Sequence, residues 1–241
     1  MGSKKEIIKN YQKEELIDTF DSTRSETYGH VWRNNYEKNL VLDSLESFKK
    51  KKIKVLDVAC GTGRVGLEIL KYNPDIEYQG LDTSKPMIKK LKSKLKEKRN
   101  ISLHLGDASN LPFKDEEFDL VYSFHLLWHL ERKDQRKIVE EMMRVTKKGG
   151  ILIFDALNKN SAYNLLRPKF LFKDNESYMN GIRIKEIKKY FGNTKTIDCR
   201  GVLDPHIKNK ILFRAITFIP NKIFKKNHFL HHMLYFKIKN N

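Results

Sequence analysis

The sequence predicts an α/β fold: a Rossmann-like, mostly parallel sheet of seven strands, with helices on both faces and an antiparallel last strand. Two observations predict it. From Ile53 onward, short apolar runs alternate with amphipathic segments of helical spacing, and the connections between them are short. Repeated β-α units of this kind form parallel sheets, and their ligands bind beyond the carboxyl ends of the strands.

The elements follow in order from local patterns. Apolar runs predict strands at 53–58, 76–82, 101–107, 118–127 and 151–156, and two more at 194–201 and 232–239 that close the sheet as an antiparallel pair. Helical spacing predicts helices at 4–20, 32–50, 63–72, 84–98, 132–148 and 183–192. Ser84 is a suitable N-cap for the helix at 84–98, with Pro86 in its first turn. Gly149-Gly150 is a suitable end for the helix at 132–148.

The composition fits a single, strongly charged domain spanning residues 1–241. At 39% hydrophobic and 32% charged residues, the chain can build a core and keep a polar surface. We divide it into an N-terminal helical lid (1–50), a core that binds a cofactor (51–157) and a basic, substrate-side region with the final strands (158–241). No apolar stretch reaches 18 residues and the first residues lack a signal-peptide core, so we expect no membrane span.

The cysteines and histidines indicate the redox compartment and argue against two possible metal sites. Cys60 and Cys199 form no C-x-x-C pair, which is typical of a reduced, cytoplasmic protein without disulfides or a cysteine zinc site. The histidines within 228–232 have no acidic or cysteine neighbour, so we expect no metal there either.

The positive charge is concentrated toward the C-terminus. Of the formal net charge of +18, residues 158–241 carry +13, with 18 basic and 5 acidic residues. Such an imbalance favours an anionic partner, either an anionic membrane surface or, more weakly, RNA. A compositional bias toward lysine that only solvates the surface explains it about as well.

The stretch "VLDVACGTGRVGLEIL" (55–70) raises the question of which nucleotide binds. Gly61, Gly63 and Gly66 form a G-x-G-x-x-G pattern after a strand, and Asp82 follows about 20 residues later, as in a dinucleotide site. Asp57, however, lies within the turn where a pyrophosphate would rest, and a carboxylate there repels an anion. It suits a ligand with a cation and no phosphate, such as S-adenosylmethionine.

Three aspartates end the first three strands and match that ligand along its length. Asp82 can accept the ribose hydroxyls, and Asp107 can accept the adenine amino group while the Ala108 N–H meets the ring. Gly61 and Gly63 allow close approach of the methionine portion because no Cβ intervenes. We weigh this against a structural interpretation, in which Asp57 only caps the turn, Gly66 only packs and Met87 only fills the core.

Five motifs then resemble the class I S-adenosylmethionine-dependent methyltransferases of the small-molecule type, similar to the quinone-biosynthesis enzymes. They are "VLDVACGTGR", "YQGLDTSKPMI", "LHLGDASNLPF", "FDLVYSFHLLWHL" and "MMRVTKKGGILIFD", in the order of that family, within residues 53–156. Ala59 departs from the glycine usual there. The resemblance implies a cofactor site at Asp57, Ala59, Gly61, Gly63, Asp82, Thr83, Met87, Asp107, Ala108, Ser123 and Phe124.

Two histidines are candidates for the base that prepares an acceptor. His125 and His129 stand four residues apart around the end of the fourth strand, so a helical turn there would point both toward one site. The resemblance favours His129, and hydrogen bonding at an element end is the alternative for each. Asp155, after the fifth strand, is a further candidate for contact with the acceptor.

The sequence thus predicts methyl transfer from S-adenosylmethionine to a small, apolar or anionic acceptor, in a cytoplasmic protein that can be peripheral to a membrane. Three alternatives remain: an RNA methyltransferase that uses the basic C-terminal third, a non-catalytic cofactor-binding protein, and a nicotinamide oxidoreductase. No Asn-Pro-Pro-Tyr or Asp-Pro-Pro-Tyr follows the fourth strand, which weakens the nucleic-acid alternative.

Overall fold

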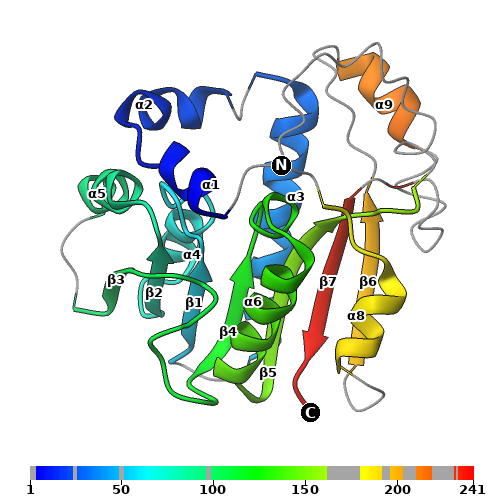
Figure 1. Ribbon diagram of the computed structural model, residues 1–241. Helices are drawn as coiled ribbons and strands as arrows, with labels where there is room; N and C mark the ends of the chain where they lie inside the picture. Colours follow the sequence, from blue (N-terminus) through cyan, green and yellow to red (C-terminus); the bar gives the residue numbers. More distant parts are fainter. Residues whose placement is uncertain are drawn as a thin grey trace.

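The computed structural model describes residues 4–23, 26–48, 52–95, 99–161, 180–191, 196–202, 210–218, 231 and 233–241. Its centre is one seven-stranded sheet with helices against both faces (Figure 1). The strands are β1 Lys54–Val58, β2 Glu77–Asp82, β3 Ile101–Leu105, β4 Phe118–Ser123, β5 Thr146–Leu157, β6 Thr196–Val202 and β7 Met233–Lys239. The helices are α1 Lys4–Asn10, α2 Glu14–Thr23, α3 Tyr28–Leu45, α4 Gly66–Tyr72, α5 Lys85–Lys94, α6 Arg132–Val145, α8 Ile184–Phe191 and α9 Lys210–Phe218.

The strand order is β3-β2-β1-β4-β5-β7-β6. The first five strands are parallel, and β7 runs antiparallel to both of its neighbours. The chain moves outward from β1 to β3 and then returns to place β4 on the other side of β1, which creates a switch point between β1 and β4. The predicted fold class is confirmed, including the antiparallel pair at the end of the chain.

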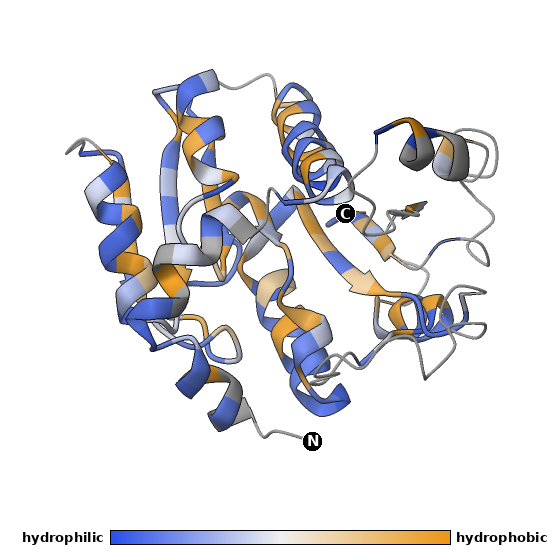
Figure 2. Ribbon diagram, turned by 90° about the horizontal axis from the view of Figure 1, so that it is seen from above, coloured by the Kyte–Doolittle hydropathy of each residue, from blue (hydrophilic) through white to orange (hydrophobic). Residues whose placement is uncertain are grey.

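Two apolar cores lie on the two faces of the sheet. One joins the sheet to α6 and α8, with Phe154, Phe236 and Met142 fully buried. The other joins it to α3 and α4, with Val41, Ile69 and Ile153 fully buried. In Figure 2, apolar residues gather along the strands and on the helix sides turned toward them, and hydrophilic residues lie on the outward sides.

Several predicted boundaries were wrong for identifiable reasons. The helix expected over 132–148 ends at Val145, because Thr146 already pairs with Phe118 of β4. Gly149 and Gly150 therefore lie inside β5 rather than ending a helix. Gly149 has φ of +74°, and a Cβ on Gly150 would lie 2.9 Å from the Asp119 carbonyl oxygen.

Other corrections concern the N-terminal part and the fourth strand. The helix expected over 4–20 is two helices, α1 and α2, and the helix expected over 32–50 begins at Tyr28, where the Thr27 hydroxyl accepts the His30 N–H. The strand expected to reach residue 127 ends at Ser123 and gives way to a short 3-10 turn, Leu127–His129. The Ser84 cap is confirmed, since its hydroxyl accepts the Met87 N–H.

None of the helices among the described residues has the length and apolar character that crossing a bilayer requires.

Candidate functional site

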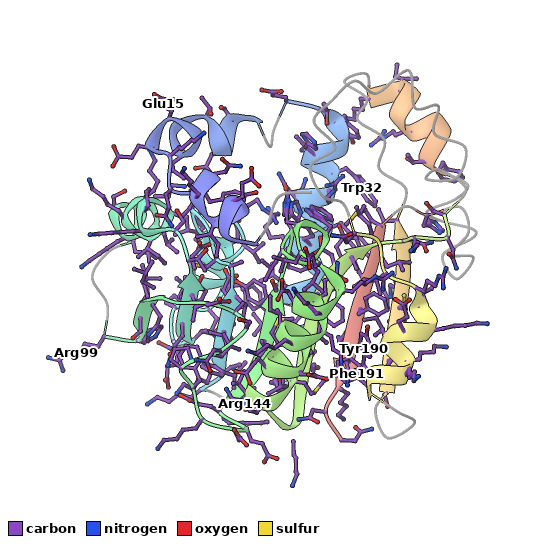
Figure 3. All side chains as sticks on the ribbon, viewed as in Figure 1. Glu15, Trp32, Arg99, Arg144, Tyr190 and Phe191 are labelled. Carbon is purple, nitrogen blue, oxygen red and sulfur yellow. The ribbon has the colours of Figure 1, made fainter. Side chains whose placement is uncertain are left out.

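A cavity opens at the carboxyl ends of the parallel strands, beside the switch point. Helices α1, α2 and α9 lie at this upper end of the molecule, and Figure 3 places Trp32 of α3 there as well, with Arg144, Tyr190 and Phe191 lower down. Most of the predicted site residues line this cavity: Asp57, Ala59, Gly61, Asp82, Thr83, Met87, Asp107, Ala108, Phe124, His125 and His129. The topology thus brings together side chains that are up to 72 residues apart in the sequence.

Gly63 and Ser123 are not among the lining residues. A Cβ on Gly63 would lie 2.2 Å from Leu91 Cδ1, so this glycine lets α5 pack against the loop. Ser123 is buried and its hydroxyl has no hydrogen-bond partner among the described residues. Their direct contact with a cofactor stays a prediction.

The glycine-rich loop is held in left-handed backbone geometry at three positions. Ala59, Gly61 and Gly63 have φ of +60°, +54° and +83°. Glycine adopts this region without steric cost, whereas alanine is strained in it. The first part of the loop is fixed to the end of β2, because the Cys60 N–H donates to the Leu81 carbonyl at 3.0 Å and the Gly61 N–H donates to Asp82 Oδ2 at 2.8 Å.

Asp57 presents a buried carboxylate to the cavity. Its Oδ2 accepts hydrogen bonds from the Tyr78 hydroxyl at 2.8 Å and the Tyr122 hydroxyl at 2.7 Å. Gly66 makes this arrangement possible, because a Cβ there would lie 2.3 Å from the Tyr78 oxygen. Burial raises the pKa of Asp57 to about 6, even though both hydroxyls favour its charged form. The charge of Arg64, which lines the same cavity, therefore does not offset the burial of Asp57.

Asp82 and Asp107 stand at the ends of the next two strands. Asp82 accepts the Gly61 N–H and, through Oδ1, the Ser84 N–H at 2.8 Å, while burial raises its pKa. Asp107 Oδ1 accepts the Ser109 N–H at 2.8 Å, which fixes the turn after β3. Both carboxylates are held by backbone donors and line the cavity, so they are oriented before any ligand arrives.

The two histidines follow β4 and line the cavity together, as the spacing predicts. His125 has φ of +63° and its N–H donates to Asp155 Oδ1 at 2.8 Å. The ring of His129 meets the rings of Tyr11 and Trp128, with centroids 6.1 and 5.9 Å away. Asp155 is not among the cavity-lining residues; it is buried behind His125.

The N-terminal helices cover the cavity through specific contacts. Ser84 Oγ donates to the Tyr11 carbonyl at 2.5 Å, and Gln12 Nε2 donates to the Thr83 carbonyl at 2.9 Å. Asp21 of α2 accepts the Thr62 hydroxyl at 2.6 Å. Ile8, Tyr11 and Asp21 line the cavity, so the predicted N-terminal lid and the glycine-rich loop both contribute to its wall.

Sequence reasoning missed a buried charged cluster next to the cavity. Its centre is Glu37 of α3, whose side chain is fully buried and which contacts His125, Arg64 and Tyr235. Its neighbours in the sequence, Asn34, Asn35, Lys38 and Asn39, are polar, so no local pattern marked it as buried. Among the described residues, Glu37, His125 and Asp155 are also a set of three whose ligand atoms lie within 4.8 Å of one another, as in a metal site.

Comparison with known proteins identifies the core of the chain. Residues 55–150 match a family described as a methyltransferase domain. The core of this chain is a methyltransferase domain. It contains the glycine-rich loop, the three aspartates and both histidines, and this agrees with the class I methyltransferase resemblance of its motifs.

Curated relatives of the methyltransferase domain act on different acceptors. A demethylmenaquinone methyltransferase of Staphylococcus carnosus is 36% identical over 148 residues, which is 61% of this chain and 55% of the relative. An ajmaline N-methyltransferase of Rauvolfia serpentina is 35% identical over 108 residues, which is 44% of this chain and 36% of the relative. The chain spans about half the length of the curated relatives it matches.

Solved structures extend the likeness of the methyltransferase fold to nearly the whole chain. Magnesium protoporphyrin IX methyltransferase from Synechocystis, with bound SAH, has a TM-score of 0.72 at 14% identity and covers 98% of this chain and 100% of that one. A [4+2]-cyclase, SpnF, has a TM-score of 0.61 at 17% identity and covers 85% of this chain and 80% of that one. At these identities the likeness establishes the fold.

Proposed function

We propose that this protein transfers a methyl group from S-adenosylmethionine to a small, apolar acceptor. The observation that carries the proposal is the single cavity into which Asp57, Asp82 and Asp107 project from three successive strand ends. Asp57 supplies the decisive feature, because its buried carboxylate lacks a full counter-charge and would gain one from the ammonium group of this cofactor.

The other residues fit the remaining parts of the cofactor. Asp82 would accept the ribose hydroxyls, and Asp107 with the Ala108 N–H would meet the adenine. Met87, Thr83 and Phe124 would line the adenosine, and the loop from Ala59 to Gly63 would pass close to the methionine portion. The buried hydroxyl of Ser123, at the end of β4, has no hydrogen-bond partner among the described residues.

The bound cofactor supplies a methyl group on a sulfonium centre that is already activated for displacement. The task of the protein is then to align the acceptor with it, which can lower the barrier by roughly 7–11 kcal/mol in favourable cases. A hydroxyl or amine acceptor must also lose a proton, and His125 and His129 are placed at the same cavity to take it.

We propose an apolar ring compound of the quinone type as the acceptor. Apolar side chains also line the cavity, among them Ile8, Leu126, Leu130 and Ile138. Such a wall favours a flat, apolar acceptor over a charged one. Several relatives are named demethylmenaquinone methyltransferase, and a reduced ring of that kind carries the hydroxyl groups that a base requires.

An apolar acceptor is consistent with a place at an anionic membrane surface, which we also propose. Helix α9 lies at the cavity end of the molecule and exposes Ile211 and Phe218, 79% and 55% exposed, beside Lys210 and Arg214 (Figure 1). Apolar and basic side chains together are typical of helices that lie at an anionic interface. Localisation would then be cytoplasmic and peripheral.

An RNA acceptor is the second candidate, since the basic residues of the C-terminal third could bind phosphates. Its affinity for the protein would fall steeply with salt, as counterions compete for the phosphates. Binding to anionic vesicles that persists at 300 mM salt, with no retention of RNA, would favour the membrane over RNA.

The test begins with cofactor binding by calorimetry. We expect binding of S-adenosylmethionine and S-adenosylhomocysteine but not of NAD, and loss of that binding in Asp82→Ala. Labelled cofactor is then incubated with demethylmenaquinol and with fractionated lipid, metabolite and RNA extracts. Transfer to the quinol or the lipid fraction supports the proposal. Binding of NAD alone, or cofactor binding without transfer to any fraction, contradicts it.

A further inference from the structure

Glu37 is the hub of a buried polar cluster that the methyl donor site does not use. Its Oε1 accepts the Tyr235 hydroxyl at 2.9 Å and lies 2.8 Å from His125 Nε2, and its Oε2 accepts Arg64 Nη2 at 2.5 Å. The partners come from three distant places: the loop before α4, the turn after β4, and β7. Because these three partners contact both carboxylate oxygens, the side chain of Glu37 is held in one orientation.

His125 is held at two points, one on its backbone and one on its ring. Its N–H donates to Asp155 Oδ1, and its Nε2 lies against Glu37. The backbone is in the left-handed region at φ +63°, which is strained for a residue with a Cβ. Two acceptors and the Trp128 ring, 4.9 Å away, keep it there. This strain is located at the cavity wall, where residues held for function are common.

The charge balance of the cluster does not call for a third cation. Arg64 pairs with Glu37, and the charge of the buried Arg33, which lies over the Trp128 ring at 5.9 Å, also lowers the pKa of Glu37, although His125 contributes more. Two guanidinium groups thus favour the ionised form of Glu37 even when His125 is neutral. A neutral imidazole satisfies the contact by donating Nε2–H to Glu37, which leaves the lone pair on Nδ1.

We propose that Glu37 is a positioning residue that fixes His125 in the Nε2–H tautomer, and that His125, rather than His129, is the base toward the acceptor. This rests on the proposed function. The acceptor hydroxyl gives its proton to Nδ1, and the electron pair of the resulting phenolate, from its oxygen or from a conjugated ring carbon, forms the bond to the methyl carbon. A ring carbon that attacks then loses its own proton to water, which restores the aromatic ring. The carbon–sulfur bond breaks and its electrons stay on the sulfur, which becomes a neutral thioether. The imidazolium that results is stabilised by Glu37 and releases its proton to water after the product leaves.

The division of labour between the two histidines follows from their surroundings. His125 lies against a fixed carboxylate that can stabilise a developing positive charge, as an orienting acid does for a catalytic histidine. His129 is packed among the rings of Tyr11 and Trp128, next to the lid. We therefore expect His129 to affect acceptor affinity and His125 to affect the rate of the chemical step.

The most direct test reads the ring itself and needs neither acceptor nor cofactor. Two-bond ¹⁵N–¹H correlation spectra of histidine-labelled protein, with His125→Asn used to assign the signal, report which ring nitrogen carries the proton. We expect a protonated Nε2 and an unprotonated Nδ1 for His125 at pH 7.5. A protonated Nδ1, or protons on both nitrogens, overturns the proposal.

Kinetics then separate positioning from folding. We expect Glu37→Gln to lower kcat about 100-fold with an unchanged KM for the donor, and the double variant with His125→Asn to be no slower than His125→Asn alone. Glu68→Gln is the control, because it also removes a glutamate but breaks only an exposed ion pair on α4. We expect it to leave kcat unchanged. Tyr235→Phe removes one donor to Glu37, keeps the core volume and should lower kcat about 10-fold.

The outcomes distinguish this proposal from the proposed function. Normal S-adenosylhomocysteine binding together with wild-type turnover in His125→Asn or Glu37→Gln overturns the positioning role alone. A divalent metal that copurifies in a 1:1 ratio and is lost in Glu37→Gln also overturns it, because the three ligand atoms would then hold an ion instead of a proton. Absent cofactor binding would overturn the proposed function.

Discussion

Asp57 and Glu37 are two buried carboxylates at the same end of the sheet with opposite electrostatic surroundings. Asp57 is 4% exposed and Glu37 is fully buried, and each accepts a hydrogen bond from a tyrosine hydroxyl. Burial raises the pKa of Asp57 to about 6. Burial acts on Glu37 in the same direction, but His125 and Arg64 outweigh it and hold the pKa of Glu37 far below its usual range.

The difference indicates which carboxylate is structural and which is kept for a ligand. Glu37 has its counter-charges within the protein, so its ionised form stabilises the native state. Asp57 accepts hydrogen bonds from two neutral hydroxyls, and the charge of Arg64 does not offset its burial, so its ionised form stays costly until a further cation arrives. Removing the charge should therefore harm stability at Glu37 and improve it at Asp57.

The largest expected effect is the loss of Glu37. Glu37→Ala leaves the half-buried guanidinium of Arg64 without its carboxylate partner, and breaking a largely buried pair in this way costs about 3–5 kcal/mol. Urea unfolding measures it. Glu68→Ala, an exposed pair with Lys71, should change the free energy of unfolding by less than about 1 kcal/mol. Equal losses in the two variants would mean that the cluster contributes no more than a surface ion pair.

Cofactor affinity should depend on the ionisation of Asp57. The ammonium group binds the carboxylate form, so affinity should be constant above a pH of about 6 and weaken by up to about tenfold per unit below it. Calorimetry with S-adenosylhomocysteine at pH 5, 6, 7 and 8 measures this. Affinity that is flat from pH 5 to 8 would remove Asp57 from the binding of a cation.

Asp155 should limit stability at neutral and high pH. Burial, together with the charge of Glu37, raises the pKa of Asp155 to about 8, so the native state holds a proton that the unfolded chain has released. Its contribution is fully present below the ordinary pKa of an aspartate and is lost progressively as the pH rises toward 8. Asp155→Asn keeps an oxygen for the His125 N–H and replaces the unpartnered Oδ2.

We expect Asp155→Asn to stabilise the protein by about 1 kcal/mol or more at pH 8 and to be neutral at pH 4. Thermal unfolding at both pH values is the measurement, with Asp75→Asn on an exposed turn as the control. Destabilisation at pH 8 would show that Asp155 is ionised and paired in the native state.

The smallest expected effect concerns the strained alanine of the glycine-rich loop. Ala59→Gly removes the steric cost of φ +60°, offset in part by the greater freedom of glycine in the unfolded chain, for a net gain of about 0.5–1 kcal/mol. Unfolding curves should show it without a change in cofactor affinity. A loss of stability would mean that the methyl group of Ala59 packs well enough to offset its strain.

Much of the fold and of the cavity lining could be predicted because both depend on local patterns. The strand–turn–helix alternation placed Asp57, Asp82 and Asp107 at one sheet edge, and the structure puts all three in one cavity. The four-residue spacing of His125 and His129 was sufficient to place both there as well. Gly149 was predicted to end a helix but lies within β5. The prediction was wrong because a glycine after a helix and a glycine within a strand give the same local pattern.

The Glu37 cluster could not be predicted, because its contacts connect residues 27, 88 and 198 positions apart. Glu37 stands among polar neighbours on α3, and only the packing of that helix reveals it as buried. The tyrosine donors to Asp57 were missed for the same reason. Gly66 was the available signal, since the space left by its missing side chain is where the Tyr78 hydroxyl lies.

The most direct test of the contrast between the two carboxylates is calorimetry and unfolding of one variant, Asp57→Asn. We predict that its affinity for S-adenosylhomocysteine falls at least about 100-fold at pH 7.5, while its free energy of unfolding without ligand rises. Wild-type affinity in Asp57→Asn, or a clear loss of stability, would contradict the account, because Asp57 would then be a structural acid like Glu37.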